Sequence, residues 1–246
     1  MDRKIRVGAV SYLNTKPLLY GIEHSAIVDK IDLQIDYPSR IASMLLNDEI
    51  DIGLVPVAII PKLKEYYINT DYCIGSEGAV ASVCLFSDVP VGQVKKVLLD
   101  YQSRTSVQLA KILLREYWKV NPVLEDAKED FREHIIGNTA GLVIGDRALE
   151  QRKQSKYIYD FGEAWKDLTG LPFVFAAWIS NKKIDQDFVE EFNKANKAGL
   201  RNLDSLLKEI KYPLFNLYEY YTEHISYFID YRKRKGLELF LDKLEK

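Results

Sequence analysis

Small polar side chains gather in loops of this 246-residue chain, where predicted strands run into helices. Hydroxyl, amide and guanidinium groups of this kind suit a small organic anion, because charge-assisted hydrogen bonds contribute about 1.5 to 3 kcal/mol each. Taken alone, they predict binding and leave catalysis open. The residues concerned are Ser11, Asn14, Ser82, Ser103, Arg104, Thr105, Ser106 and Asp146.

The strongest anion-binding pattern is Ser103-Arg104-Thr105-Ser106. It follows a predicted strand at 96–100 and precedes a predicted helix whose apolar residues recur at helical spacing. We expect Ser103 to cap that helix, whose first N–H groups and positive dipole end would face a carboxylate or phosphate beside the Arg104 guanidinium. The alternative is an ordinary capped helix with a solvated arginine.

The elements that would position these loops alternate between strand and helix in the first part of the chain. Such alternation predicts a parallel sheet covered on both faces, with ligands at the carboxyl ends of the strands. The predicted strands are 5–10, 33–37 and 51–57, and the predicted helices follow Pro17 and Pro38.

Three further residues lie at strand-to-helix junctions or turns. Ser39 is predicted to cap the second helix, and Pro56 closes the third strand at the same edge of the sheet. Gly170 precedes Pro172 in a turn before a later strand. We therefore expect all three near the ligand.

Two long predicted strands, 78–87 and 173–180, flank a complete α/β unit. Within that unit we expect strands at 96–100, 120–124 and 141–146, and helices from 105 and around 128–133. The pattern predicts two lobes with a ligand cleft between them: residues 1–87 plus 178–246, and residues 88–177.

After residue 180 the chain is predicted to be helical, with Gly199 interrupting a long amphipathic helix. Residues 212–231 hold eight Tyr or Phe residues. An aromatic stripe of this kind is expected to pack as helices on the first lobe. Contact between two copies of the chain, a homodimer, is the alternative.

Composition excludes several classes. The 34 Lys and Arg balance 36 Asp and Glu, so neither nucleic acid nor a membrane surface is an expected partner. The first strand begins without a preceding apolar leader, so we expect a cytoplasmic protein.

Cys73, Cys84 and the scattered histidines predict no metal ligand set and no disulfide. GxGxxG, GxxxxGK[ST], HExxH and GxSxG patterns are absent from the sequence, which disfavours dinucleotide, nucleotide, zinc-hydrolase and esterase functions.

Several segments in order resemble the chorismate dehydratase family of the futalosine route to menaquinone. The resemblance covers roughly residues 5 to 180 and includes 11–18, 51–57, 82–87, 103–106, 145–149 and 165–178. It implies an α/β, two-lobed, periplasmic-binding-protein-like (type II) fold. It also implies a hydro-lyase that removes water from chorismate to give 3-[(1-carboxyvinyl)oxy]benzoate, with no metal and no organic cofactor.

Chorismate has two carboxylates, a hydroxyl and an apolar ring, so the polar loops fit it. We expect Asn14 and Ser82 to orient the substrate, and the ring proton to pass either to Asp146 or to a carboxylate of the substrate itself. The residues expected to bind the substrate are Ser11, Ser39, Pro56, Ser103, Arg104, Thr105, Ser106 and Gly170.

Two alternatives remain at this point. The fold belongs mainly to solute receptors, so a solute-binding protein for a small carboxylate would show the same pattern. The sister enzyme of the same route, which forms 1,4-dihydroxy-6-naphthoate, would share the fold, but we would expect a histidine in its active-site loop. His24, His134 and His224 fall outside the motif loops.

Overall fold

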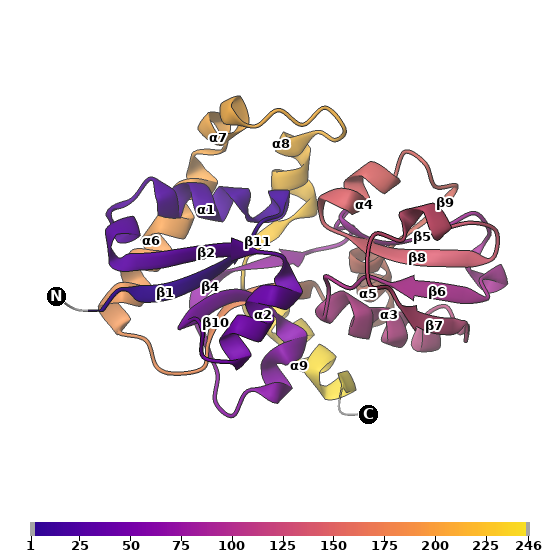
Figure 1. Ribbon diagram of the computed structural model, residues 1–246, viewed down its shortest axis with the longest axis horizontal. Coiled ribbons are helices and arrows are strands. Elements are labelled where there is room, and N and C mark those ends of the chain that lie inside the picture. The colour runs from indigo at the N-terminus through magenta and orange to yellow at the C-terminus, as the bar shows by residue number, and fades with distance from the viewer. Residues whose placement is uncertain (1–2, 245–246) are drawn as a thin grey trace.

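The computed structural model describes residues 3–244 and contains two β-sheets that lie side by side, each with its own helices (Figure 1). We call the two halves the first and second lobes. The first sheet has the strand order β11-β4-β10-β3-β1-β2. Its strands are β1 (Ile5–Val10), β2 (Ile31–Asp36), β3 (Ile52–Pro56), β4 (Tyr67–Ser76), β10 (Phe173–Ser180) and β11 (Ser226–Phe228).

The second sheet has the order β7-β6-β8-β5-β9. Its strands are β5 (Val83–Ser87), β6 (Lys96–Leu99), β7 (Val123–Asp126), β8 (Thr139–Ile144) and β9 (Tyr157–Asp160). The helices of the two lobes are α1 (Lys16–Glu23), α2 (Pro38–Leu46), α3 (Thr105–Glu116), α4 (Asp146–Gln151), α5 (Phe161–Thr169), α6 (Gln186–Arg201), α7 (Leu203–Glu209), α8 (Leu217–Glu219) and α9 (Tyr231–Leu244).

The parallel part of the first sheet is confirmed, because β1 pairs in parallel with both β2 and β3. The rest is antiparallel: β10 lies between β3 and β4 and runs opposite to both. The strand β4 was not predicted, since Asn69 and Asp71 break its apolar run. In the second sheet β6 is parallel to β7 and β8, whereas β5 is antiparallel to β8 and β9, so both sheets are mixed.

The positions of the crossovers differ from the prediction. β5 pairs with β8 and β9 in the second sheet, although the sequence placed it in the first lobe. β10 pairs entirely within the first sheet. The chain thus leaves the first lobe between Ser76 and Val83 and returns between Thr169 and Phe173. Strand pairing decides these boundaries, and apolar runs in the sequence do not reveal which strand will be the partner.

The predicted strand at 78–87 begins only at Val83 because the preceding loop is held by a side chain of the second lobe. The N–H groups of Val80 and Ala81 donate to the Asp160 carboxylate at 2.9 and 2.7 Å. Ala81 has φ 62°, which ends extended backbone there. Asp160 also caps α5 through the N–H groups of Gly162 and Glu163.

Three other local predictions were wrong. The strand expected at 120–124 begins at Val123. The helix expected around 128–133 is a single turn, Arg132–His134. Residues 212–231 contain a wide π-helical turn, Tyr220–His224, and β11 as well as the short helix α8.

Gly199 does not interrupt α6. A Cβ atom there would lie 1.9 Å from the Pro17 carbonyl oxygen of α1, and one at Gly21 would lie 1.9 Å from the Ala195 carbonyl oxygen of α6. The two glycines therefore let the helix backbones touch at their crossing.

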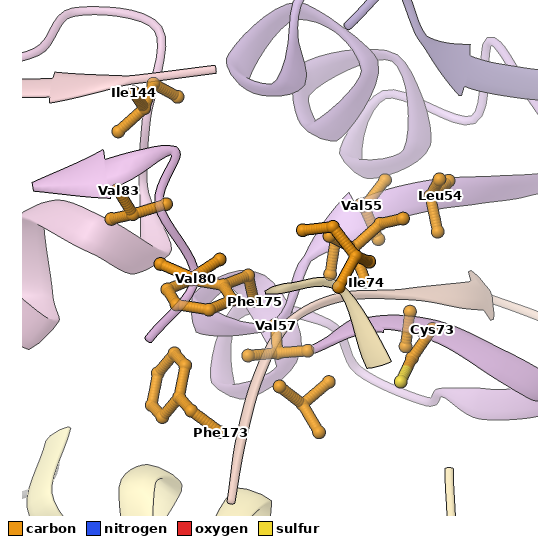
Figure 2. Packing of buried hydrophobic residues seen from close by; sticks show 14 of the residues in the cluster. Leu54, Val55, Val57, Cys73, Ile74, Val80, Val83, Ile144, Phe173 and Phe175 are labelled. Atoms are coloured by element: carbon orange, nitrogen blue, oxygen red, sulfur yellow. The ribbon is translucent and has the colours of Figure 1, made fainter. Parts of the chain in front are cut away.

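A large apolar core runs through both lobes, and a smaller second cluster, which includes Phe86 and Phe131, lies within the second lobe. Figure 2 shows Val83 and Ile144 of the second sheet near Val80 and Phe175, with Ile74 of the first sheet nearby. Within residues 3–244 no helix has the length and apolar character needed to cross a membrane.

Candidate active site

A small cavity lies where the two lobes meet, and both sheets contribute to its wall. Its volume is about 50 Å³, space for roughly one or two water molecules. The polar wall comes from the turn after β1 and the start of α3, and the apolar wall comes from strands of both sheets. The lining residues are Val10, Tyr12, Asn14, Thr15, Pro38, Pro56, Ile74, Val83, Ser103, Thr105, Ser106, Ile144, Gly145, Phe175 and Ala176.

The start of α3 reaches this cavity. Ser103, Thr105 and Ser106 all line it. The N-cap residue of α3 is Arg104, and Ser103, one residue earlier than the N-cap, accepts the Ser106 N–H with its Oγ at 3.0 Å. The first N–H groups of a helix have no intrahelical acceptor, so this end carries donors and the positive end of the dipole. Thr105 Oγ1 accepts the Ala58 N–H at 3.1 Å and so joins the lobes.

Arg104 does not line the cavity, although its neighbours do. Its Nη2 donates to Ser43 Oγ of α2 at 2.9 Å, and the residue borders a separate surface hollow with Lys62 and Lys111. Alternate side chains at the helix start leave in different directions, and the sequence does not show which one faces the ligand. The carboxylate fork expected at Arg104 is therefore not placed at this cavity.

Asn14 lines the cavity from the first lobe, on the short 3₁₀ turn Leu13–Thr15 that follows β1. Thr15 Oγ1 donates to Asn14 Oδ1 at 3.1 Å. Because the amide oxygen is engaged in this way, the amide NH₂ is the end that remains to donate to a ligand.

Ser82 lies behind the wall, next to the lining residue Val83. It is fully buried, and its backbone oxygen accepts the Gly145 N–H at 2.8 Å. Its Oγ accepts a 2.7 Å hydrogen bond from the Tyr220 hydroxyl.

Asp146 begins α4 directly after the lining residue Gly145. Its Oδ1 accepts the Leu13 N–H at 2.9 Å, which joins the lobes next to Asn14. Burial raises the pKa of this carboxyl to about 6, and the hydrogen bond from Leu13 opposes the rise. Such a pKa suits a group that accepts a proton near neutral pH.

Three of the other predicted residues lie outside the cavity wall, whereas Pro56 lines it at the end of β3. Ser11 is exposed. Ser39 is inside the first turn of α2 rather than its cap, and its Oγ donates to the Tyr101 carbonyl of the second lobe at 3.2 Å. Gly170 ends α5 with φ +72°, and its carbonyl accepts from Arg232.

Sequence reasoning missed a charged network beside the cavity. Arg147 Nη2 donates to both Asp100 oxygens at 2.8 Å and to Gln102 Oε1 at 2.9 Å. Tyr12, from the first lobe, donates its hydroxyl to the same Gln102 oxygen. Burial raises the pKa of Asp100, and Arg147 opposes that rise. The network therefore holds Tyr12 across the gap between the lobes.

Gly145 makes room for the Tyr12 ring. A Cβ there would lie 2.7 Å from the ring, and the residue has φ +65°. The sequence signal for this network is Gly145 followed by Asp146 and Arg147 at the end of a strand, but the sequence does not show that Arg147 pairs with Asp100.

The lining residues of the described chain include no lysine, arginine or histidine. An anion here would be held by neutral donors and by the start of α3. Across residues 3–244, no group of three His, Cys, Asp or Glu side chains is arranged to hold a metal ion.

A two-lobed α/β chain with a cavity between its lobes has the periplasmic-binding-protein fold. A protein from Archaeoglobus fulgidus has a similar structure, with a TM-score of 0.76 and 14% identity over 98% of this chain and 97% of that one. A Candida albicans protein, described as exhibiting the generic periplasmic binding protein structural fold, has a TM-score of 0.62 and 12% identity, covering 99% and 95% of the two chains. At these identities the likeness concerns the fold alone.

The sequence matches the profile of a menaquinone biosynthesis family over residues 5–246, and the chain belongs to that family. A chorismate dehydratase of Thermus thermophilus is 26% identical over 97% of this chain and 94% of its own length. One of Campylobacter jejuni is 25% identical over 95% of both chains.

Proposed function

We propose that this protein is a chorismate dehydratase, which removes water from chorismate to give 3-[(1-carboxyvinyl)oxy]benzoate in menaquinone biosynthesis. The observation that carries the proposal is the cavity between the lobes of a chain that belongs to the menaquinone biosynthesis family. Both curated relatives are named chorismate dehydratases and align over nearly the whole chain.

The cavity wall suits such a substrate. Hydroxyls of Ser103, Thr105 and Ser106 at the start of α3 would hold a carboxylate, and the amide of Asn14 would approach from the first lobe. Apolar side chains such as Ile74 and Phe175 would flank the ring. Asn14 and Ser82 are the proposed orienting residues.

In the reaction a ring C–H bond breaks, its electron pair forms the new ring double bond, and the neighbouring C–O bond breaks. The hydroxyl takes up one proton as its C–O bond breaks and leaves as water, and the ring becomes aromatic, so much of the driving force resides in the substrate. The enzyme then needs to position the molecule, accept the ring proton and return one proton to the leaving oxygen. Asp146 is one proposed acceptor, because its pKa of about 6 leaves it ionised at neutral pH. A carboxylate of the substrate is the other.

The volume of about 50 Å³ is far below the roughly 300 Å³ of small ligand sites, so the lobes must separate to admit chorismate. Several hydrogen bonds that cross the gap would break on opening, among them Tyr12 to Gln102, Ala58 to Thr105, and Leu13 to Asp146. We infer that these contacts belong to a closed form, in which space for only one or two water molecules remains at the site.

The decisive experiment mixes the protein with chorismate in the presence of EDTA and follows aromatisation of the ring by absorbance and the product by mass. Loss of water supports the proposal, whereas binding without loss of water would favour a solute-binding protein.

The sister naphthoate-forming enzyme is disfavoured because none of the three histidines lines the cavity. The thiols of Cys73 and Cys84 are both buried and unpaired, in keeping with a proposed location in the reducing cytoplasm.

A further inference from the structure

Tyrosines from the C-terminal part of the chain hydrogen-bond to each of the three residues assigned to catalysis. Tyr220 donates to Ser82 Oγ at 2.7 Å. Tyr227 donates to the Asn14 backbone oxygen at 2.8 Å, and Tyr212 donates to the Asp146 backbone oxygen at 3.3 Å. We call Tyr212, Tyr220 and Tyr227 the tyrosine arm. In sequence it lies far from all three partners.

We propose that the tyrosine arm positions the catalytic groups of the dehydratase, with Tyr220 directing the hydroxyl of Ser82 and Tyr227 fixing the turn that carries Asn14. The proposal rests on the function proposed above. Tyr212, Tyr220 and Tyr227 are positioning residues, because each contacts a candidate catalytic residue and none lines the cavity.

The contact between Tyr220 and Ser82 determines where the serine proton can go. A phenol is more acidic than an aliphatic hydroxyl, so Tyr220 donates and Ser82 Oγ accepts. The acceptor for the serine proton within the described residues is the Val80 carbonyl at 3.4 Å, which is long against the roughly 2.8 Å of an O–H···O bond. The Ser82 proton is thus weakly held and is available to a stronger acceptor than the Val80 carbonyl.

Burial keeps Tyr220 in its donor form. The ring is fully buried, and burial raises the pKa of its hydroxyl well above the ordinary value. The residue begins the π-helical turn Tyr220–His224, and such wide turns are frequent at functional sites. His224 Nδ1 lies 3.1 Å from the Ala79 carbonyl, so the same turn also contacts the loop that leads to Ser82.

Tyr227 acts on the other side of the site. It follows the π turn in β11, which pairs with β4 at the edge of the first sheet. Since β4 is part of that sheet, the Tyr227 hydroxyl reaches Asn14 from a rigid element. Loss of this hydroxyl would let the Leu13–Thr15 turn shift within the closed cavity.

Tyr221 provides a matched control. It is the neighbour of Tyr220, is 2% exposed, and its hydroxyl has no hydrogen-bond partner among residues 3–244. Tyr221→Phe and Tyr220→Phe therefore remove the same atom from adjacent buried rings, and only the second variant releases a catalytic residue.

The test compares kcat and KM for chorismate dehydration, and the melting temperature, in Tyr220→Phe, Tyr227→Phe, Tyr221→Phe, Ser82→Ala and the double variant Ser82→Ala/Tyr220→Phe. We expect kcat to fall about tenfold in Tyr220→Phe and Tyr227→Phe, the effect of one hydrogen bond in the transition state, with KM changed less than about twofold. Tyr221→Phe should match the wild type. The double variant should be no slower than Ser82→Ala, because Tyr220 acts through Ser82.

Wild-type kcat in both Tyr220→Phe and Tyr227→Phe would overturn the proposal. So would equal losses in Tyr220→Phe and Tyr221→Phe, or a double variant that multiplies the two single losses. A failure of the proposed function looks different, because the wild-type protein itself would then not dehydrate chorismate. The positioning role would be refuted together with that function.

Discussion

Replacing Asp146 with asparagine should stabilise the protein at neutral pH and slow the proposed dehydration. Burial raises the pKa of this carboxyl from 3.8 to about 6. The folded state therefore binds the proton more tightly than the unfolded chain does. The carboxyl costs no stability below pH 3.8, and the cost grows as the pH rises to about 6.

The size of the effect follows from that shift of about two pKa units. At about 1.4 kcal/mol per unit the cost of the ionised carboxyl at neutral pH is about 3 kcal/mol. The side chain keeps some contact with water, so we expect a gain of about 2 kcal/mol in the free energy of unfolding. The amide of Asp146→Asn retains an oxygen that can accept the Leu13 N–H.

Urea unfolding of both proteins at about pH 4 and about pH 7.5 measures this difference, which should be small at the lower pH and reach its full size at the higher one. If Asp146→Asn raised the free energy of unfolding by the same amount at both pH values, the gain could not come from removing the buried charge of Asp146.

The same variant tests the chemistry. If Asp146 accepts the ring proton, wild-type kcat rises with pH through an apparent pKa of about 6, and Asp146→Asn loses both this limb and most of its turnover. Unchanged turnover in Asp146→Asn would eliminate this acceptor and favour a carboxylate of the substrate.

Three other substitutions probe the site and the fold. Asn14→Ala should lower kcat about 100-fold, with a smaller change in KM, because the amide is proposed to act on the reacting substrate; steady-state kinetics would contradict this if KM alone changed. Arg104→Ala should change KM less than about twofold, since the Arg104 guanidinium contacts α2 rather than the cavity, and should lower the free energy of unfolding by about 1 kcal/mol. A large rise in KM would instead show that Arg104 binds the substrate. Gly199→Ala should lower the free energy of unfolding by about 2 kcal/mol, because its Cβ would lie 1.9 Å from the Pro17 oxygen. Substitution of the exposed Lys197 by alanine is the control, and equal urea midpoints for the two variants would argue against the close helix crossing.

The proposed closed form would also explain how neutral donors could hold a substrate carboxylate at this site. Arg147 lies beside the cavity, but its guanidinium already donates to Asp100 and Gln102. Removal of water on closure strengthens hydrogen bonds to a bound carboxylate, and the start of α3 supplies donors without a buried unpaired charge.

The sequence alone was sufficient to predict the elements built from strong local signals. Apolar runs at 5–10 and 173–180 predicted β1 and β10, and helical spacing after Thr105 predicted α3, whose first turn donates a hydrogen bond to the Ser103 side chain. The order of strands and helices, together with the resemblance of the motifs, predicted a two-lobed chain. Each of these signals acts between residues that are close in the sequence.

Strand partners, side-chain directions and distant contacts were decided by the tertiary structure. Apolar residues at 83–87 do not show that β5 will pair with β8 and β9. A polar run at a helix start does not show that Arg104 leaves the cavity while Thr105 enters it. The aromatic stripe predicted packing, but only the fold brings Tyr220 to Ser82 and Tyr227 to Asn14. Such contacts join residues more than a hundred positions apart, and their geometry exists only once both lobes have packed around one core.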